Sequence, residues 1–120
     1  NRTSATNIRV DMGSDLLNFT VNAMSNNTWY WVWLQYTASS KTSDIYLDNV
    51  QSSSGAQAHA NNLALAATTN IVVGADIDGN SARAGNMDNF AFYNGVTSAA
   101  ERLTEFQLAA STIGHFALII

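Results

Sequence analysis

Three tryptophans in one short segment have a spacing that could support the binding of a ligand. They alternate along one short segment, at Trp29, Trp31 and Trp33. Flat aromatic rings on one side of a strand can stack on the C–H faces of a sugar, but aromatic rings also fill cores and interfaces. We favour packing between sheets or under a helix for these rings, and a carbohydrate-binding platform is the alternative.

An acidic loop is a second candidate for ligand binding, because it places oxygen ligands at alternate positions, Asp76, Asp78 and Asn80. Carboxylate and amide oxygens are the ligands that a hard cation such as calcium requires. An EF-hand is excluded, since Ser81 stands where that motif needs glycine and Met87 where it needs a bidentate glutamate. Calcium binding is therefore one interpretation, and the other is a solvated turn in which Asp and Asn side chains bond their own backbone.

Catalytic residues in a known arrangement are absent from the sequence. Neither His59 nor His115 lies near a Ser, Asp or Cys pattern typical of a triad or a zinc site, and the chain has no cysteine. A glycoside hydrolase needs two carboxylates that face each other across a cleft, whereas the only glutamates, Glu101 and Glu105, fall on the exposed side of a predicted helix. We therefore expect a protein that is not an enzyme.

The elements that would position these residues include a strand followed by a helix near the end of the chain. Apolar and polar residues alternate over residues 89–94, which predicts a strand with one buried face. Ser98 and Glu101 form a capping box, so a short helix should begin at Ser98 and run to Ala110. At about 100° per residue, one face of this helix carries Ala99, Leu103, Phe106 and Ala110. The opposite face carries Glu101 and Glu105.

Short strands separated by turn residues make up most of the remaining chain. The predicted strands cover residues 8–12, 17–23, 29–36, 44–47, 71–73, 89–94 and 116–120, with residues 63–67 ambiguous between strand and helix. Residues 1–7 are predicted to form a polar arm or loop, and Asp48-Asn49 is a two-residue hairpin signal. About eight short strands with one helix predict an all-β, two-sheet antiparallel sandwich that occupies residues 1–120 as a single domain.

Several short motifs occur in an order that is found in one known superfamily. They are Trp29 and Val32 followed by Tyr36, the hairpin of residues 45–49, the strand and glycine of residues 71–74, then Gly85, Met87-Asp88, Tyr93-Asn94 and Ser98 to Glu101. Together they resemble the laminin G-like, concanavalin A-like lectin superfamily, over roughly residues 28 to 105. The resemblance implies a jelly-roll sandwich shortened at its N-terminal side. It also implies a calcium ion bound in loops at one rim, for which Asp76, Asp78 and Asn80 are the candidates.

Composition and charge narrow the range of partners. Only 12% of the residues are charged, against about 25% in soluble cytosolic proteins, which favours an extracellular or virion-surface location. The five basic residues are scattered and the net charge is −4, so the chain offers no stripe that could follow a nucleic-acid backbone. No apolar run approaches the ~20 residues that a membrane span needs.

These observations predict a non-catalytic interaction or structural module of an extracellular or virion-surface assembly, such as a phage particle. The aromatic strand has large side chains on both faces and the chain ends in an apolar segment, residues 116–120, so we expect surfaces that another chain covers. The expected partners are protein subunits, either further copies of this chain or a neighbouring one, in an oligomer. The alternative function is a calcium-assisted lectin domain that binds a surface glycan.

Overall fold

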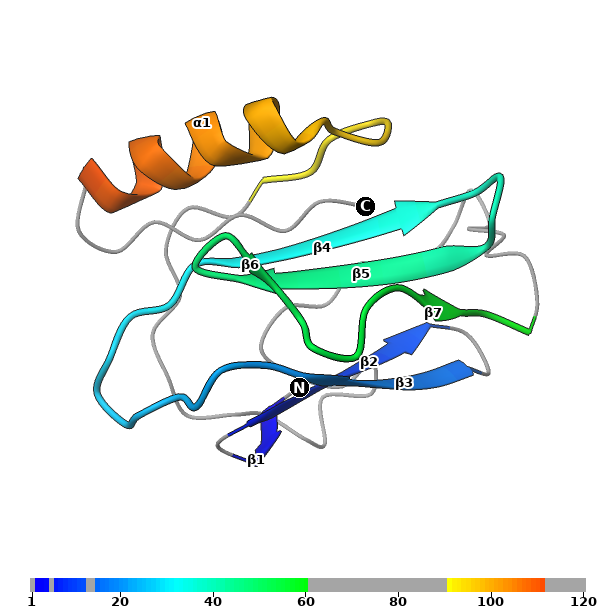
Figure 1. Cartoon of the computed structure of the whole chain (residues 1–120), viewed down its shortest axis with the longest axis horizontal. Helices are drawn as coiled ribbons and strands as arrows, with labels where there is room; N and C mark the ends of the chain where they lie inside the picture. Colours follow the sequence, from blue (N-terminus) through cyan, green and yellow to red (C-terminus); the bar gives the residue numbers. More distant parts are fainter. Residues whose placement is uncertain (1, 5, 13–14, 61–90, 112–120) are drawn as a thin grey trace.

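The computed structural model describes residues 2–4, 6–12, 15–60 and 91–111, and within them it has two antiparallel sheets and one helix (Figure 1). The first sheet has the strand order β1-β2-β3, formed by Arg2–Ser4, Asn7–Met12 and Asp15–Thr20. The second sheet has the order β4-β5-β6, with β7 also paired to β5, formed by Val32–Thr37, Thr42–Leu47, Val50–Gln51 and Gln57–Ala58. Helix α1 spans Ala99–Ser111. The prediction of a two-sheet β architecture with one short helix is confirmed.

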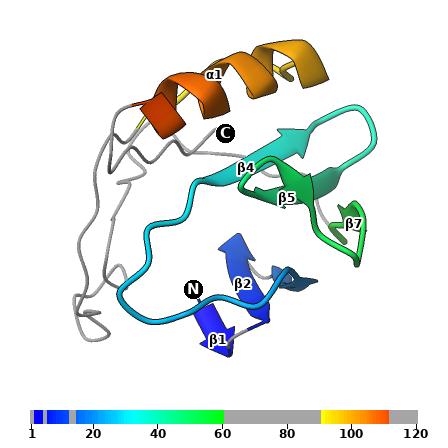
Figure 2. The same ribbon diagram turned by 60° about the vertical axis from the view of Figure 1, so that its left-hand side comes forward.

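The elements are stacked in three layers. The first sheet lies against one face of the second sheet, and α1 lies along the other face of the second sheet, as the two views agree (Figures 1 and 2). The second sheet is therefore covered on both faces, which explains why its sequence has large apolar side chains at both even and odd positions. Within the described ranges, no helix has the length and apolar character to cross a bilayer.

The first sheet is built on the predicted hairpin. Strands β2 and β3 pair antiparallel from Asn7↔Thr20 to Met12↔Asp15. The expectation of an arm or loop over residues 1–7 is wrong for Arg2–Ser4, which pair with β2 as strand β1. An unpaired strand edge leaves backbone donors and acceptors without partners, so pairing with the outer edge of β2 decided the conformation of a segment whose side chains gave no strand pattern.

The second sheet is built on two tight turns that the sequence predicted. Residues 38–41 connect β4 to β5, and Asp48-Asn49 connects β5 to β6 as a two-residue hairpin. Both hairpin residues have left-handed φ, 49° at Asp48 and 62° at Asn49, which is the conformation that Asp and Asn tolerate in such turns. The Asp48 carboxylate also accepts a hydrogen bond from the Trp31 backbone N–H at 2.8 Å, and this bond fixes the segment that leads into β4.

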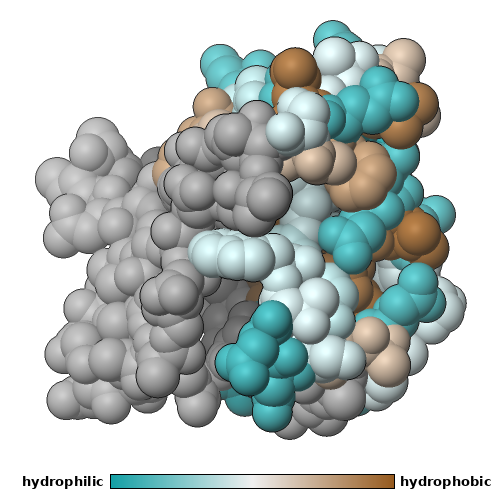
Figure 3. Space-filling model, turned by 90° about the vertical axis from the view of Figure 1, so that its left-hand side faces the viewer, coloured by the Kyte–Doolittle hydropathy of each residue, from teal (hydrophilic) through white to brown (hydrophobic). Residues whose placement is uncertain are grey.

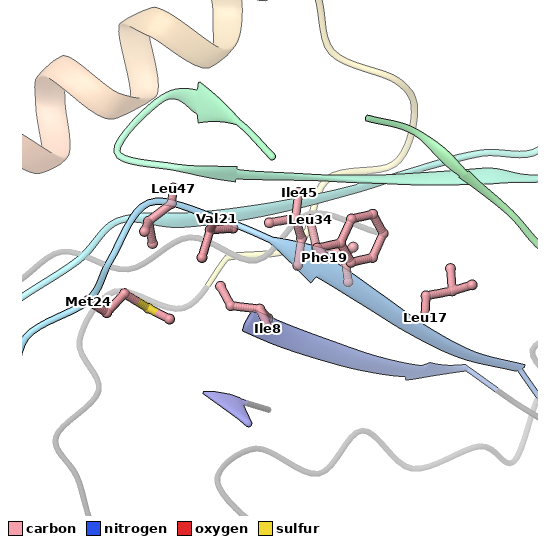
Figure 4. Packing of buried hydrophobic residues seen from close by; sticks show 8 residues of the cluster. All are labelled: Ile8, Leu17, Phe19, Val21, Met24, Leu34, Ile45 and Leu47. Carbon is pink, nitrogen blue, oxygen red and sulfur yellow. The ribbon is translucent and has the colours of Figure 1, made fainter. Parts of the chain in front are cut away.

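The main core lies between the two sheets (Figure 4). Alternate residues of β3 and β5 point into it, in keeping with the period of two in a strand. The buried residues of this core are Ile8, Leu17, Phe19, Val21, Met24, Leu34, Ile45 and Leu47. Because these residues come from both sheets, burial of their side chains holds the sandwich together.

The serine-rich loop between β6 and β7 forms hydrogen bonds from the second sheet to the first sheet. The Ser53 backbone N–H donates to the Thr20 carbonyl at 2.8 Å, and the Thr20 N–H donates to the Ser54 hydroxyl at 2.8 Å. The Gln57 amide donates to the Asn18 carbonyl on the same strand. The residues that follow β6 thus supply partners to Asn18 and Thr20 on the edge of β3 that faces away from β2.

Helix α1 begins as predicted but is rotated relative to the prediction. The Ser98 N–H donates to Glu101 Oε2 at 2.7 Å and the Glu101 N–H donates to Ser98 Oγ at 3.2 Å, which completes the capping box. The half-buried face, however, is formed by Arg102, Glu105, Phe106 and Ala109. At about 100° per residue this face is roughly 80° from the predicted apolar face, so Leu103 is exposed and Glu105 is not on the outer side.

The predicted strand over residues 89–94 is not present in its described part. Residues 91–94 have no strand partner among the described residues, although burial still alternates, with Ala91 and Tyr93 turned inward and Phe92 and Asn94 outward. The Tyr93 ring stacks on Trp33 below the helix. Packing of this ring, together with the Thr97 hydroxyl bond to Gln35 at 3.1 Å, positions the segment in place of ladder hydrogen bonds.

Candidate functional site

An aromatic cluster fills the space between β4 and α1. The rings of Trp31 and Trp33 stack with their centroids 5.0 Å apart, and Tyr93 stacks on the other side of Trp33 at 5.7 Å. The Phe106 ring of α1 meets Trp31 edge to face at 5.5 Å. These are favourable aromatic arrangements, and Trp33 is fully buried. The cluster holds the helix on the sheet.

The three tryptophans of the candidate carbohydrate platform therefore do not share one exposed face. Trp31 and Trp33 are buried in the aromatic cluster, whereas Trp29 is 46% exposed in the loop before β4. The bond from the Trp31 N–H to Asp48 draws Trp31 onto the sheet, and Trp29 lies beyond this attachment point. Only one of the three rings is accessible for stacking on a ligand.

The buried indoles carry polar atoms that find no partner within the described part of the chain. This applies to the Nε1–H donors of Trp31 and Trp33. A buried donor without an acceptor costs about 1 to 3 kcal/mol, which is smaller than the gain from burying two large rings. The burial of these rings is thus explained by packing, which outweighs the lost hydrogen bonds.

Arg102 attaches α1 to the β5–β6 hairpin. Its guanidinium carbon lies 3.6 Å from the centroid of the Tyr46 ring, and its Nε–H donates to the Asn49 side chain at 3.1 Å. Burial raises the pKa of the Tyr46 hydroxyl, with the nearby Arg102 charge acting in the opposite direction and Asp44 acting in the same direction as burial. A cation over an aromatic face is attractive, so this arginine helps to dock the helix on the hairpin.

Glu105 also has a packing role on the inner face of α1. Burial raises the pKa of the Tyr93 hydroxyl, and the charge of Glu105 and its hydrogen bond to Tyr93 raise it further. The carboxylate thus accepts a hydrogen bond from the hydroxyl of the tyrosine that stacks on Trp33. Contrary to the sequence expectation, Glu105 lies beside the aromatic cluster.

Serine, histidine and aspartate side chains meet at one end of the sandwich, although the sequence gave no sign of such a group. The Ser43 hydroxyl lies 2.7 Å from His59 Nε2, and Asp15 Oδ2 lies 3.4 Å from His59 Nδ1. Ser43 lies in β5, His59 directly follows β7, and Asp15 is the first residue of β3. The Tyr36 ring packs edge to face on the imidazole with centroids 5.4 Å apart.

This group has the residue types of a hydrolytic triad but not its accessibility. A triad serine must present its hydroxyl to the substrate carbonyl, whereas Ser43 has no exposed surface. The Asp15 carboxylate accepts a bond from the Ala60 backbone N–H at 3.1 Å, and the His59 backbone N–H donates to the Lys41 carbonyl at 2.8 Å. The geometry therefore describes a buried polar network that joins the two sheets.

Sequence reasoning missed this network because its members are far apart along the chain. The pairing of β7 with β5, Thr42↔Ala58 and Ser43↔Gln57, is what brings His59 next to Ser43. Strand β7 has only two residues, too few for a period-two pattern to be visible. No local signal in the sequence marks the network, because Ser43 stands near the start of a strand with mixed polar and apolar residues and His59 lies 16 residues further on.

The proposed calcium ligands lie outside the described residues. This applies to Asp76, Asp78 and Asn80, and also to Asp88 and His115. Among the residues that the structure does describe, no group of three or more His, Cys, Asp or Glu side chains could hold a metal ion. The calcium hypothesis is thus neither supported nor opposed by the site geometry.

Comparisons with known proteins give no relatives. No family model matches the chain, and neither the curated proteins nor the solved structures contain a significant match to it.

Proposed function

We propose that this protein is a non-catalytic interaction and structural module of an extracellular or virion-surface assembly, built on a lectin-like jelly-roll sandwich. The observation that carries the proposal is the orientation of α1. The helix turns charged residues toward the sheet, Arg102 and Glu105, and leaves leucines at the surface, with Leu103 42% and Leu108 59% exposed.

This orientation departs from that of a surface helix without a partner, because two charged side chains, Arg102 and Glu105, share the half-buried face with Phe106 and Ala109. Such a helix buries its apolar stripe and exposes its charged residues. At about 100° per residue, Leu103 and Leu108 lie on opposite flanks of the exposed half of α1, and two further apolar side chains, Phe92 and Val96, are exposed in the segment before it. In Figure 3 hydrophobic side chains (brown) reach the surface over α1, at the top of the view. Apolar side chains exposed in this number along one helix and the segment before it favour a surface that another protein covers.

The residue types that could act in catalysis or binding are used for internal contacts, which supports a role without catalysis. His59 contacts both Ser43 and Asp15 where the two sheets meet, and two of the three tryptophans pack under α1. The low share of charged residues, 12%, supports an assembled extracellular or virion-surface protein. The partners that follow are further copies of this chain or a neighbouring subunit.

Light scattering after size exclusion tests the proposal. We expect the protein to form multimers whose mass rises with concentration, and the double substitution Leu103→Ser with Leu108→Ser to shift it to the monomer. The matched control is Leu16→Ser, which removes a leucine of similar exposure, 63%, from the first sheet and should leave the multimer intact. A monomer at all concentrations would contradict assembly from copies of this chain, and a multimer that the double substitution leaves unchanged would contradict the assigned surface.

Carbohydrate binding is a second candidate, because Trp29 remains exposed. Its neighbours Asn26, Asn27 and Thr28 are also exposed, so polar groups that could bond sugar hydroxyls lie beside an accessible ring. A glycan ligand of the folded state should raise the melting temperature by mass action. We expect Trp29→Ala to abolish that shift, and EDTA to abolish it as well if calcium assists. The absence of any shift across a panel of glycans would exclude this candidate.

A further inference from the structure

We propose that Asn94-Gly95 is a site of spontaneous backbone modification, at which the asparagine converts to aspartate and isoaspartate. Among the asparagines of this chain, only Asn94 is followed by glycine. Asparagine is thermolabile, and glycine is the residue that hinders attack by its own backbone nitrogen least, because it has no side chain. The inference does not depend on the proposed function.

The reaction needs only water and a base from the solvent. The base removes the proton from the Gly95 backbone nitrogen, which then attacks the side-chain carbonyl carbon of Asn94. A new N–C bond closes a five-membered succinimide ring, the bond to the side-chain nitrogen breaks, and ammonia leaves. Water then opens the ring at either carbonyl, which gives aspartate or isoaspartate. The net change is the exchange of an amide and water for a carboxylic acid and ammonia.

The structure leaves the reacting atoms accessible. Asn94 and Gly95 are both exposed and lie in a bend outside every described strand and helix. Gly95 has a φ of 124°, and a Cβ built on it would meet nothing within 4 Å. Among the described residues, the Gly95 N–H has no hydrogen-bond partner that would have to be broken first.

The position of this bend gives the reaction a structural consequence. On one side the Tyr93 ring is fixed on Trp33 at 5.7 Å, and on the other side the Thr97 hydroxyl is bonded to Gln35 at 3.1 Å. Isoaspartate adds one carbon to the main chain between these two fixed points, so one of the contacts must move. The added negative charge should matter less, because Asn94 lies more than a turn before α1 and the effect of a charge on a helix end falls off within one turn.

Peptide mapping of the folded protein after incubation tests the site. Trypsin should release residues 84–102, since Arg83 and Arg102 flank a stretch without lysine or arginine. This peptide carries two internal controls, Asn86 and Asn89, which precede methionine and phenylalanine. Fragmentation that separates aspartate from isoaspartate should place the conversion at Asn94, with a rate that rises with pH. Conversion at Asn94 no faster than at Asn86 and Asn89 would overturn the proposal.

Two variants separate the modification from its consequence. Asn94→Gln should abolish the conversion on this time scale, because its longer side chain would have to close a six-membered ring, which forms far more slowly than the five-membered one. Freshly prepared Asn94→Asp carries the charge without the extra main-chain carbon and should keep the melting temperature of the unmodified protein, whereas the isoaspartate form should melt at a lower temperature. If the isoaspartate form and Asn94→Asp melt together, the proposed effect on the segment before α1 is wrong.

Discussion

At the scale of single residues, several ionisable and polar side chains of the described structure make contacts inside the protein. His59 bonds Ser43 and faces Asp15, Arg102 covers Tyr46, and Glu105 bonds the Tyr93 hydroxyl. A polar group that is buried must be paired or it destabilises the fold. The bond between Ser43 and His59 therefore contributes to stability, whereas His59 Nδ1, 3.4 Å from Asp15, is buried without a hydrogen-bond partner among the described residues. Substitution of single side chains tests these contributions.

Ser43→Ala tests the buried network. The substitution leaves His59 Nε2 without its 2.7 Å partner in a buried position, so we expect a loss of about 1 to 3 kcal/mol in the free energy of unfolding. Ser39→Ala, in the exposed turn after β4, is the control and should stay within about 0.5 kcal/mol. Urea denaturation measures both. A serine-reactive fluorophosphonate should not label Ser43 in the folded protein, and labelling would contradict its burial.

Glu101 gives a prediction about pH. Hydrogen bonds from the Ser98 backbone N–H and hydroxyl lower the pKa of its carboxyl group below the ordinary value of 4.5. A lowered folded-state pKa stabilises the protein above the unfolded pKa, and this stabilisation is lost as the pH falls through the folded pKa. We expect Glu101→Gln to be less stable than the native chain near neutral pH, with the difference shrinking below pH 4.5. An equal difference across the whole range would show that the carboxylate charge does not stabilise the helix start.

At the scale of elements, β4 and α1 depend on each other. The strand alone would expose Trp33, and the apolar side chains that the helix packs against the sheet are Phe106 and Ala109. Isolated helices of this length are marginal in water, so the aromatic cluster is what stabilises α1. The attachment also explains the rotation of the helix, because Arg102 and Phe106 must both face the sheet to reach Tyr46 and Trp31.

Two tryptophan substitutions test this dependence. Trp33→Ala removes a fully buried ring that contacts both Trp31 and Tyr93, so we expect a loss of about 3 to 5 kcal/mol and a loss of helical circular dichroism. Trp29→Ala removes an exposed ring and should change the free energy of unfolding by no more than about 0.5 kcal/mol. Equal effects from the two substitutions would mean that the cluster does not stabilise the fold.

At the scale of the whole molecule, the second sheet is the central layer. It shares the main core with the first sheet on one face and the aromatic cluster with α1 on the other. The loop between β6 and β7 adds hydrogen bonds from this layer to β3. The conformation of that loop therefore affects how firmly the two sheets are joined.

Gly55→Ala tests the contribution of this loop. Gly55 has a left-handed φ of 65°, and a Cβ added there would meet nothing within 4 Å. The expected cost, about 1 to 2 kcal/mol in the free energy of unfolding, comes from the backbone conformation alone. The control is Ala56→Ser, at the exposed next residue of the same loop, which should be close to neutral. A neutral Gly55→Ala would show that the loop can relax without loss of the sheet-to-sheet bonds.

Much of the architecture could be predicted from local patterns. Alternation in residues 17–19 and 45–47, the Asp48-Asn49 turn and the capping box at Ser98 all placed elements that the structure contains. These signals work because each depends on neighbours within a few residues, through side-chain period, left-handed φ or helix-end hydrogen bonds. The candidate site was less predictable, since the sequence does not show which of the three tryptophans are buried between the second sheet and α1.

The sequence by itself thus determined the approximate positions of β2, β3, β4 and β5, the Asp48-Asn49 turn and the start of α1, and it limited the available chemistry by its lack of cysteine and of a local catalytic motif. Only the tertiary structure decided that Arg2–Ser4 pair as a strand, that α1 turns Arg102 inward and Leu103 outward, and that His59 meets Ser43. The physical reason is that pairing and burial connect residues distant in the chain. The free energies of strand pairing and burial exceed local conformational preferences, and they produce no pattern among neighbouring residues from which these contacts could be predicted.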